Sequence, residues 1–150
     1  MKARIITLLI LITSVVSAGA QDLLEMIKRD INAERRTIVA EALTVPLEAE
    51  TEFWHMYNDM EQELDLITDR RAKNIQKFAD NYENVTDDIA DDLAKNYFDM
   101  EAGRLKINKA YYKKAAKLIS KKEAARFIQL LGQIQLLIDI QIAAEVPLIE

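Results

Sequence analysis

The scarcity of helix-breaking residues is the feature that most constrains this fold. After residue 20 the chain has two glycines, Gly103 and Gly132, and two prolines, Pro46 and Pro147. Glycine and proline are the residues that most often interrupt a helix or strand. The alternating β-branched runs and Asn-Gly or Asp-Gly turns typical of hairpins are missing, and apolar residues recur every three or four positions. The sequence therefore predicts an all-α fold.

Four helices are expected, over about residues 22–42, 46–83, 87–118 and 121–145. A residue whose hydroxyl can cap a helix lies just before or near the start of each of the last three helices. These residues are Thr44, Thr86 and Ser120. Ser120 and Glu123 have the spacing of a capping box, in which the serine caps forward and the glutamate caps back. Pro147 disfavours helix at the residue before it, so the last helix should end there.

Each expected helix carries an apolar face at helical spacing. The face of the first helix comprises Leu24, Ile27, Ile31 and Ile38. That of the second comprises Phe53, Tyr57, Met60, Leu64, Ile67, Phe78 and Tyr82. The third has one stripe with Leu93, Tyr97, Met100, Ile107, Tyr111 and Leu118, and a second with Phe98, Leu105, Tyr112 and Ile119.

The second and third helices should form an elongated antiparallel hairpin, with two further helices against it. Each would exceed 30 residues, or roughly 45 Å at 1.5 Å per residue. The second opens with acidic residues: Glu48, Glu50, Glu52, Asp59, Glu61, Glu63 and Asp65. The third closes with basic residues: Arg104, Lys106, Lys109, Lys113, Lys114 and Lys117. An antiparallel arrangement lays these two blocks side by side, which favours that orientation.

The first twenty residues have the pattern of a secretory signal peptide. Lys2 and Arg4 precede an apolar run over residues 5–16, and Ala18 and Ala20 are the small residues of a cleavage site. The run is shorter than the roughly 20 residues that a transmembrane span needs. We therefore expect an exported chain, periplasmic in a Gram-negative cell and otherwise secreted, whose residues 21–150 form a single helical domain without a stable membrane anchor.

Composition excludes several classes of function. The chain has no cysteine and one histidine, so thiol catalysis, disulfide scaffolds and multi-histidine metal sites are ruled out. Three glycines leave no phosphate-binding loop, and we expect no enzyme activity and no cofactor. Loss of Lys2 and Arg4 with the signal peptide takes the formal net charge from −5 to −7, which argues against nucleic acid as a partner.

Two small constellations remain as candidate sites. Glu52, His55 and Asp59 share one face of the second helix and could hold a metal weakly, or they form a solvated acidic face with one incidental histidine. Arg71 interrupts the apolar stripe of the same helix. A buried arginine needs a carboxylate, and the candidates for a structural ion pair are Glu101 and Asp139. Alternatively Arg71 binds an anionic ligand or extends to solvent.

The last helix is apolar on nearly all sides. Between residues 127 and 142 its polar positions are Gln129, Gln133, Gln135, Asp139 and Gln141. Such a helix is buried, either within the monomer or at an interface. The sequence leaves both arrangements open. Where part of it is exposed, the expected partner-binding residues are Leu136, Leu137 and Ile140 with Lys113 and Lys117 at the rim.

Several short segments resemble a group of small uncharacterised exported proteobacterial helical proteins. These segments are Phe53-Trp54 with Tyr57, Asp69-Arg70-Arg71, Asn81-Tyr82, Thr86-Asp87, Ala124-Ala125-Arg126-Phe127 and Pro147-Leu148. More distantly, the layout resembles the Spy/CpxP-like periplasmic family, whose hallmark is Leu-Thr-x-x-Gln. Here Leu43-Thr44 begins one copy, with Leu47 in place of the glutamine, and Ile119 to Glu123 is a degenerate second copy. The resemblance implies a thin helical dimer that acts as an ATP-independent chaperone or a stress-signalling accessory.

Together these observations favour a non-enzymatic exported protein that binds a protein partner or an unfolded client. One alternative is a structural adaptor or homo-oligomer subunit that docks through its last helix. A second is a weak metal or ligand binder.

Overall fold

The computed structural model describes residues 34–149, and within this range it contains helices and no strand. A helix over residues 34–42 precedes the 3₁₀ turn η1 (Leu47–Ala49) and the long helix α2 (Glu50–Asp80). The 3₁₀ turn η2 (Tyr82–Asn84) leads to α3 (Asp87–Leu118), and α4 (Lys121–Glu145) follows. The predicted all-α fold is confirmed. The predicted signal peptide and residues 22–33 of the first helix lie outside the described residues.

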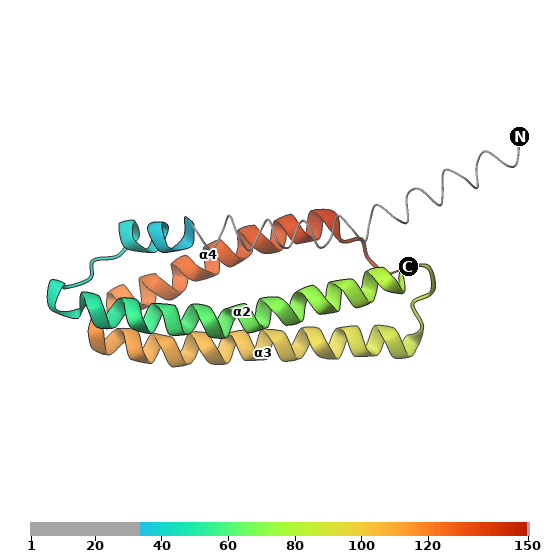
Figure 1. The fold of residues 1–150 in the computed structure, drawn as a ribbon, viewed down its shortest axis with the longest axis horizontal. Coiled ribbons are helices and arrows are strands. Elements are labelled where there is room, and N and C mark those ends of the chain that lie inside the picture. Colours follow the sequence, from blue (N-terminus) through green and yellow to red (C-terminus); the bar gives the residue numbers. More distant parts are fainter. Residues whose placement is uncertain (1–33, 150) are drawn as a thin grey trace, which may run out of the picture.

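α2 and α3 form the expected elongated antiparallel hairpin, and α4 turns back along it (Figure 1). Two predicted caps are present. Thr86 Oγ1 accepts a hydrogen bond from the Ile89 N–H at 3.4 Å, and Ser120 Oγ accepts one from the Glu123 N–H at 3.1 Å. These caps satisfy first-turn donors and fix where α3 and α4 begin.

The predicted roles of Thr44 and Glu123 are wrong. Pro46, rather than Thr44, directly precedes η1, and no side chain caps that turn. The Glu123 carboxylate was expected to cap back onto Ser120, but its Oε2 accepts a hydrogen bond from the Thr44 N–H at 3.1 Å. The link between residue 44 and residue 123 thus joins the loop before α2 to the first turn of α4, because tertiary folding brings the two segments together.

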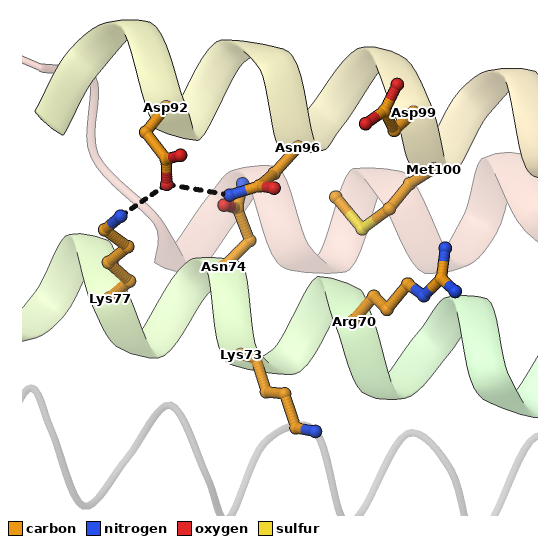
Figure 2. A pocket seen from close by; sticks show the side chains of 8 residues that line it. All are labelled: Arg70, Lys73, Asn74, Lys77, Asp92, Asn96, Asp99 and Met100. Atoms are coloured by element: carbon orange, nitrogen blue, oxygen red, sulfur yellow. Dashed lines mark hydrogen bonds and ion pairs between the residues drawn. The ribbon is translucent and has the colours of Figure 1, made fainter. Parts of the chain in front are cut away.

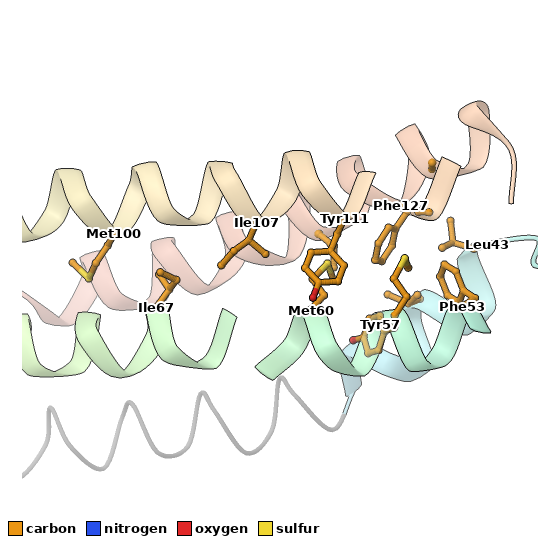
Figure 3. Close-up of a cluster of buried hydrophobic side chains, with 14 residues drawn as sticks. Leu43, Phe53, Tyr57, Met60, Ile67, Met100, Ile107, Tyr111 and Phe127 are labelled. Atoms are coloured by element: carbon orange, nitrogen blue, oxygen red, sulfur yellow. The ribbon is translucent and has the colours of Figure 1, made fainter. Parts of the chain in front are cut away.

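The main core lies where α2 begins, α3 ends and α4 begins (Figure 3). Its most buried large side chains are Tyr111, Phe53, Phe127, Met60 and Val39. The Phe127 ring lies 5.6 Å from the Phe53 ring in an edge-to-face arrangement, a geometry that aromatic pairs favour. A second cluster forms along the rest of α4, where Ile134, Ile138 and Ile142 pack against Ala72 and Ile75 of α2.

Five residues of the predicted apolar faces are exposed instead, namely Ile38, Tyr82, Tyr97, Phe98 and Leu105. Ile38 is 38% exposed and its neighbour Val39 is fully buried, because Val39 shares a face with the buried residues Arg35 and Leu43, four positions away on either side. Tyr82 and Tyr97 lie toward the far end of the hairpin, beyond the main core, and they are 40% and 52% exposed.

The antiparallel orientation of α2 and α3 was predicted correctly. Near their connecting turn the two helices are joined by an ion pair between Lys77 of α2 and Asp92 of α3, with signs opposite to those of the predicted blocks. Within the acidic block, Glu63 Oε1 accepts a hydrogen bond of 2.7 Å from the Tyr111 hydroxyl of α3, and Glu61 pairs with Arg35.

The two helical glycines differ in their surroundings, and this difference predicts different effects of alanine. A Cβ at Gly132 would meet nothing within 4 Å, whereas one at Gly103 would lie 2.9 Å from Ile67 Cδ1. Gly132→Ala should raise the free energy of unfolding by about 0.5–1 kcal/mol through helix propensity. Gly103→Ala should gain less, since Ile67 must shift. Urea denaturation of the two variants measures the difference, and a larger gain at Gly103 would contradict the packing described.

Candidate functional site

The most exposed apolar surface of α4 lies in its second half. Leu136, Leu137 and Ile140 are 58%, 61% and 58% exposed. Phe127, Leu131, Ile134, Ile138 and Ile142 form the buried face of the same helix. Of the two arrangements that the sequence left open, the monomer therefore buries one face of α4 and leaves large apolar side chains on another. Large side chains so exposed are typical of interaction surfaces when they are contiguous.

α3 also carries two exposed apolar side chains. Phe98 is 65% exposed and Leu105 is 53% exposed. α3 and α4 run in opposite directions from the turn that joins them, so residues equally far from this turn lie level with each other. Leu136 is therefore level with the stretch of α3 between Phe98 and Leu105. Leu136 and Glu101 line the same cavity, and Phe98 and Leu105 share a helical face with Glu101. We call Phe98, Leu105, Leu136, Leu137 and Ile140 the apolar patch.

The sequence did contain a signal for the α3 half of the apolar patch. Phe98 and Leu105 belong to the predicted second stripe, whose members are seven residues apart. That stripe was expected to pack, and its later members Tyr112 and Ile119 are partly buried against the main core. The pattern showed that a second face exists, but not that its first half stays uncovered while Met100 and Ile107, on another face of the same stretch of α3, belong to the main core.

The predicted basic rim is not part of the apolar patch. Lys113 and Lys117 are exposed near the end of α3, close to the turn into α4. Leu136 and Ile140 lie four to five turns into α4, so roughly 15–25 Å along the helix axes separates the two groups. The structure therefore brings the three predicted apolar residues together and leaves the two lysines apart.

Arg71 forms an ion pair with Asp139, one of its two predicted partners. Asp139 also accepts a hydrogen bond of 2.8 Å from Gln135 Nε2. The other predicted partner, Glu101, forms an ion pair within α3 instead, with its Oε1 atom 3.6 Å from Arg104 Nη2. Because Arg71 belongs to α2 and Asp139 to α4, the pair joins two helices and accounts for an arginine inside an apolar stripe.

A cavity of about 410 Å³ lies next to this ion pair. Its walls come from all four helical segments of the described chain, with Arg35, Thr68, Arg104, Gln135 and Asp139 among the polar residues. Arg35 Nη1 donates to both carboxylate oxygens of Glu61 at 3.0 Å. Burial raises the pKa of Glu61 above its usual range. The positive charge of Arg35 lowers this pKa, but its effect is smaller than that of burial. The interior of the bundle is therefore polar around this cavity. It is apolar in the main core on one side and in the cluster of Ile134, Ile138 and Ile142 on the other.

A second cavity, of about 440 Å³, lies between α2 and α3 (Figure 2). Asp92 Oδ2 accepts hydrogen bonds from Lys77 and, at 3.0 Å, from Asn96 Nδ2. Asn74 Nδ2 donates to the Leu93 carbonyl at 3.1 Å. Lys73 points away from the other side chains in this view. These contacts hold the far part of the hairpin together and leave a cleft of mixed charge.

The weak metal candidates do not form a site. Glu52, His55 and Asp59 are all exposed on the first half of α2. Within the part of the chain that the structure describes, no group of three histidine, cysteine, aspartate or glutamate side chains is placed to hold a metal ion.

α4 is the one described helix that is long and apolar enough to cross a bilayer, with a mean hydropathy of 1.5 over 18 residues. In the structure its buried face packs in the helical bundle. No protein-family model, no curated protein and no solved structure matches the chain. The relationship to the Spy/CpxP-like family therefore remains a proposal.

Proposed function

We propose that this chain is an exported, non-enzymatic protein that binds other proteins through the apolar patch and acts as an ATP-independent chaperone, in the manner of the Spy/CpxP-like family. The observation that carries the proposal is the exposure of Leu136 and Ile140 on α4 and of Phe98 and Leu105 on α3. An unfolded client offers short apolar segments, and burial of apolar area drives such contacts at about 25 cal/mol per Å².

The surroundings of the apolar patch suit weak and reversible binding. Charged and amide side chains lie next to it along both helices, including Asp99, Lys106, Gln129 and Gln133. A polar rim keeps such a surface soluble and limits how tightly a client is held. The helices that carry the patch are long and packed on the core, so the surface is formed before a client arrives.

An aggregation assay tests this function. The chain is expressed in full in an exporting bacterium, purified, and added to a denatured client diluted out of denaturant without ATP. Near-stoichiometric protein should suppress turbidity, and Leu136→Gln with Ile140→Gln should weaken this suppression several-fold. Both sites are exposed, so the free energy of unfolding should change by less than about 0.5 kcal/mol per site.

A matched control separates the apolar patch from general surface hydrophobicity. Leu47 and Leu66 are also exposed, at 84% and 62%, but they lie on η1 and α2. Leu47→Gln with Leu66→Gln should leave suppression intact. No suppression by the folded parent, or equal loss in both variants, would rule out the chaperone proposal. A stable homodimer without suppression, seen by light scattering, would favour the structural adaptor instead.

A further inference from the structure

The cavity of about 410 Å³ takes its walls from one face of each long helix. α3 contributes Glu101, Arg104 and Asn108, and α2 contributes Leu64 and Thr68. Residues three, four or seven positions apart lie on the same side of a helix, so each set forms a continuous strip. The volume falls within the range of small-molecule sites, which is about 300–1,000 Å³.

The α4 wall of the cavity has a gap at its glycine. Four residues of α4 line the cavity and share one helical face, at positions i, i+3, i+4 and i+7: Gly132, Gln135, Leu136 and Asp139. A Cβ at Gly132 would meet nothing within 4 Å. A side chain at this position would therefore occupy space that the glycine leaves free.

Arg104 brings a poorly paired cation to the cavity. Its side chain is 13% exposed, and its Nη2 lies 3.6 Å from Glu101 Oε1, which is beyond hydrogen-bond length. The Glu101 side chain is 45% exposed, so water screens much of its charge. A guanidinium carries five N–H donors in a planar fork that matches a carboxylate. Arg104 is therefore suited to bind an anion in the cavity.

Arg35 brings a second donor whose bonding is incomplete. It lines the same cavity, is 8% exposed, and donates from Nη1 to Glu61. Its Nε is buried and has no hydrogen-bond partner within the described chain. A buried donor without a partner costs free energy, which a ligand oxygen would recover. Asn108, one helical turn from Arg104, adds amide N–H donors to the same region.

The charges around the cavity favour a ligand with a single negative charge. Arg35 and Arg71 each donate hydrogen bonds to a carboxylate, that of Glu61 and that of Asp139. Arg104 has no such bond within residues 34–149, so one positive charge is left largely unmatched. A dianion would add a second negative charge near these carboxylates, and like charges at short range repel.

The remaining wall is apolar. It consists of Leu64 on α2 and of Leu131 and Leu136 on α4. Leu131 is buried, whereas Leu136 is 58% exposed. Apolar walls with a few polar groups are typical of sites that bind small organic molecules. The ligand should therefore combine an oxyanion with an alkyl or aryl group.

We propose that this cavity binds a small monocarboxylate that carries an apolar chain. The carboxylate accepts hydrogen bonds from Arg104 and from Arg35 Nε, and the chain lies against Leu64 and Leu131. The proposal goes beyond the proposed function, because a client would contact the exposed apolar patch and not the cavity. Leu136 is the residue that belongs to both.

Calorimetric titration with sodium octanoate, well below the concentration at which it forms micelles, tests the proposal. The protein is expressed in full with its leader and purified. Saturable binding of one octanoate per chain is expected. 1-Octanol is the probe for the chain without the charge, and inorganic phosphate is the probe for an oxyanion without the chain. Each should bind at least about tenfold more weakly than octanoate.

Two variants and a matched control place the octanoate in the cavity. Arg104→Gln should weaken binding about tenfold or more, since it removes charge-assisted hydrogen bonds. Gly132→Leu should also weaken binding about tenfold by filling free space at the wall, and it should keep the fold because leucine favours helix over glycine. Lys106→Gln removes an exposed cation of α3 that does not line the cavity, and affinity should stay within about twofold.

Every outcome decides the question. Saturable octanoate binding that both variants weaken and the control keeps would support the proposal. No saturable binding by the folded parent would overturn it, as would octanol or phosphate binding as tightly as octanoate. Equal losses in Lys106→Gln and Arg104→Gln would also overturn it. If Arg104→Gln fails to fold, Gly132→Leu decides, because unchanged affinity in that variant places octanoate outside the cavity. The aggregation assay uses a separate readout, so failure here does not bear on the chaperone proposal.

Discussion

Phe127→Ala should cost about 3–5 kcal/mol of unfolding free energy, the largest effect we expect from a single substitution in this protein. Phe127 is fully buried at the start of α4. Its ring lies 5.6 Å from Phe53 and 6.3 Å from Tyr57, so removing it leaves a cavity between α4 and α2 and breaks two aromatic contacts. The loss should appear in urea denaturation as a lower midpoint with an unchanged slope.

Leu136→Ala is the matched control for Phe127→Ala. It also shortens a large apolar side chain on α4, but Leu136 is 58% exposed. Its cost should stay within about 0.5 kcal/mol. Similar losses in the two variants would mean that α4 does not pack on α2 through the face described.

Arg35→Ala should be the second most damaging substitution, at about 3 kcal/mol near neutral pH. The side chains of Arg35 and Glu61 are only 10% and 16% exposed, so removing the arginine leaves a partly buried carboxylate without its ion-pair partner. Replacing both residues, as Arg35→Leu with Glu61→Leu, should recover most of the loss, because the buried charge is removed with its partner. Urea denaturation of the single and double variants measures this recovery.

The cost of Arg35→Ala should also depend on pH. Burial already raises the pKa of Glu61 above its usual value of 4.5, so the folded state binds this proton more readily than the unfolded chain. For this group alone, lowering the pH from above the pKa of Glu61 in the folded protein to below its pKa in the unfolded chain therefore favours the folded state. Without Arg35 the pKa rises further, and the loss measured at about pH 5 should be smaller than at about pH 7. A loss that stays constant over this range would contradict a charged Glu61 as its cause.

Local sequence determined the helices. The scarcity of glycine and proline, the capping hydroxyls of Thr86 and Ser120, and the three- and four-residue apolar spacing predicted α3 and α4 at the bounds that the structure shows. These signals act within one or two turns, so they can be read without knowing what lies nearby. Arg71 was recognised for a similar reason, since a charge in an apolar stripe requires a partner, and the structure supplies Asp139.

Only the tertiary structure decided which apolar and polar groups meet. The sequence predicted Leu136 and Ile140 as exposed if part of the last helix is uncovered, but it did not decide between burial and exposure of that helix, and it placed Phe98 and Leu105 on a stripe expected to pack. The sequence did not predict that the Glu123 carboxylate accepts a hydrogen bond from the Thr44 N–H, or that Glu61 forms an ion pair with Arg35. The partners are 79 residues apart in the first case and 26 in the second. Helical periodicity fixes the face on which a side chain lies, whereas the length, crossing and neighbours of the packed helices determine whether that face is covered.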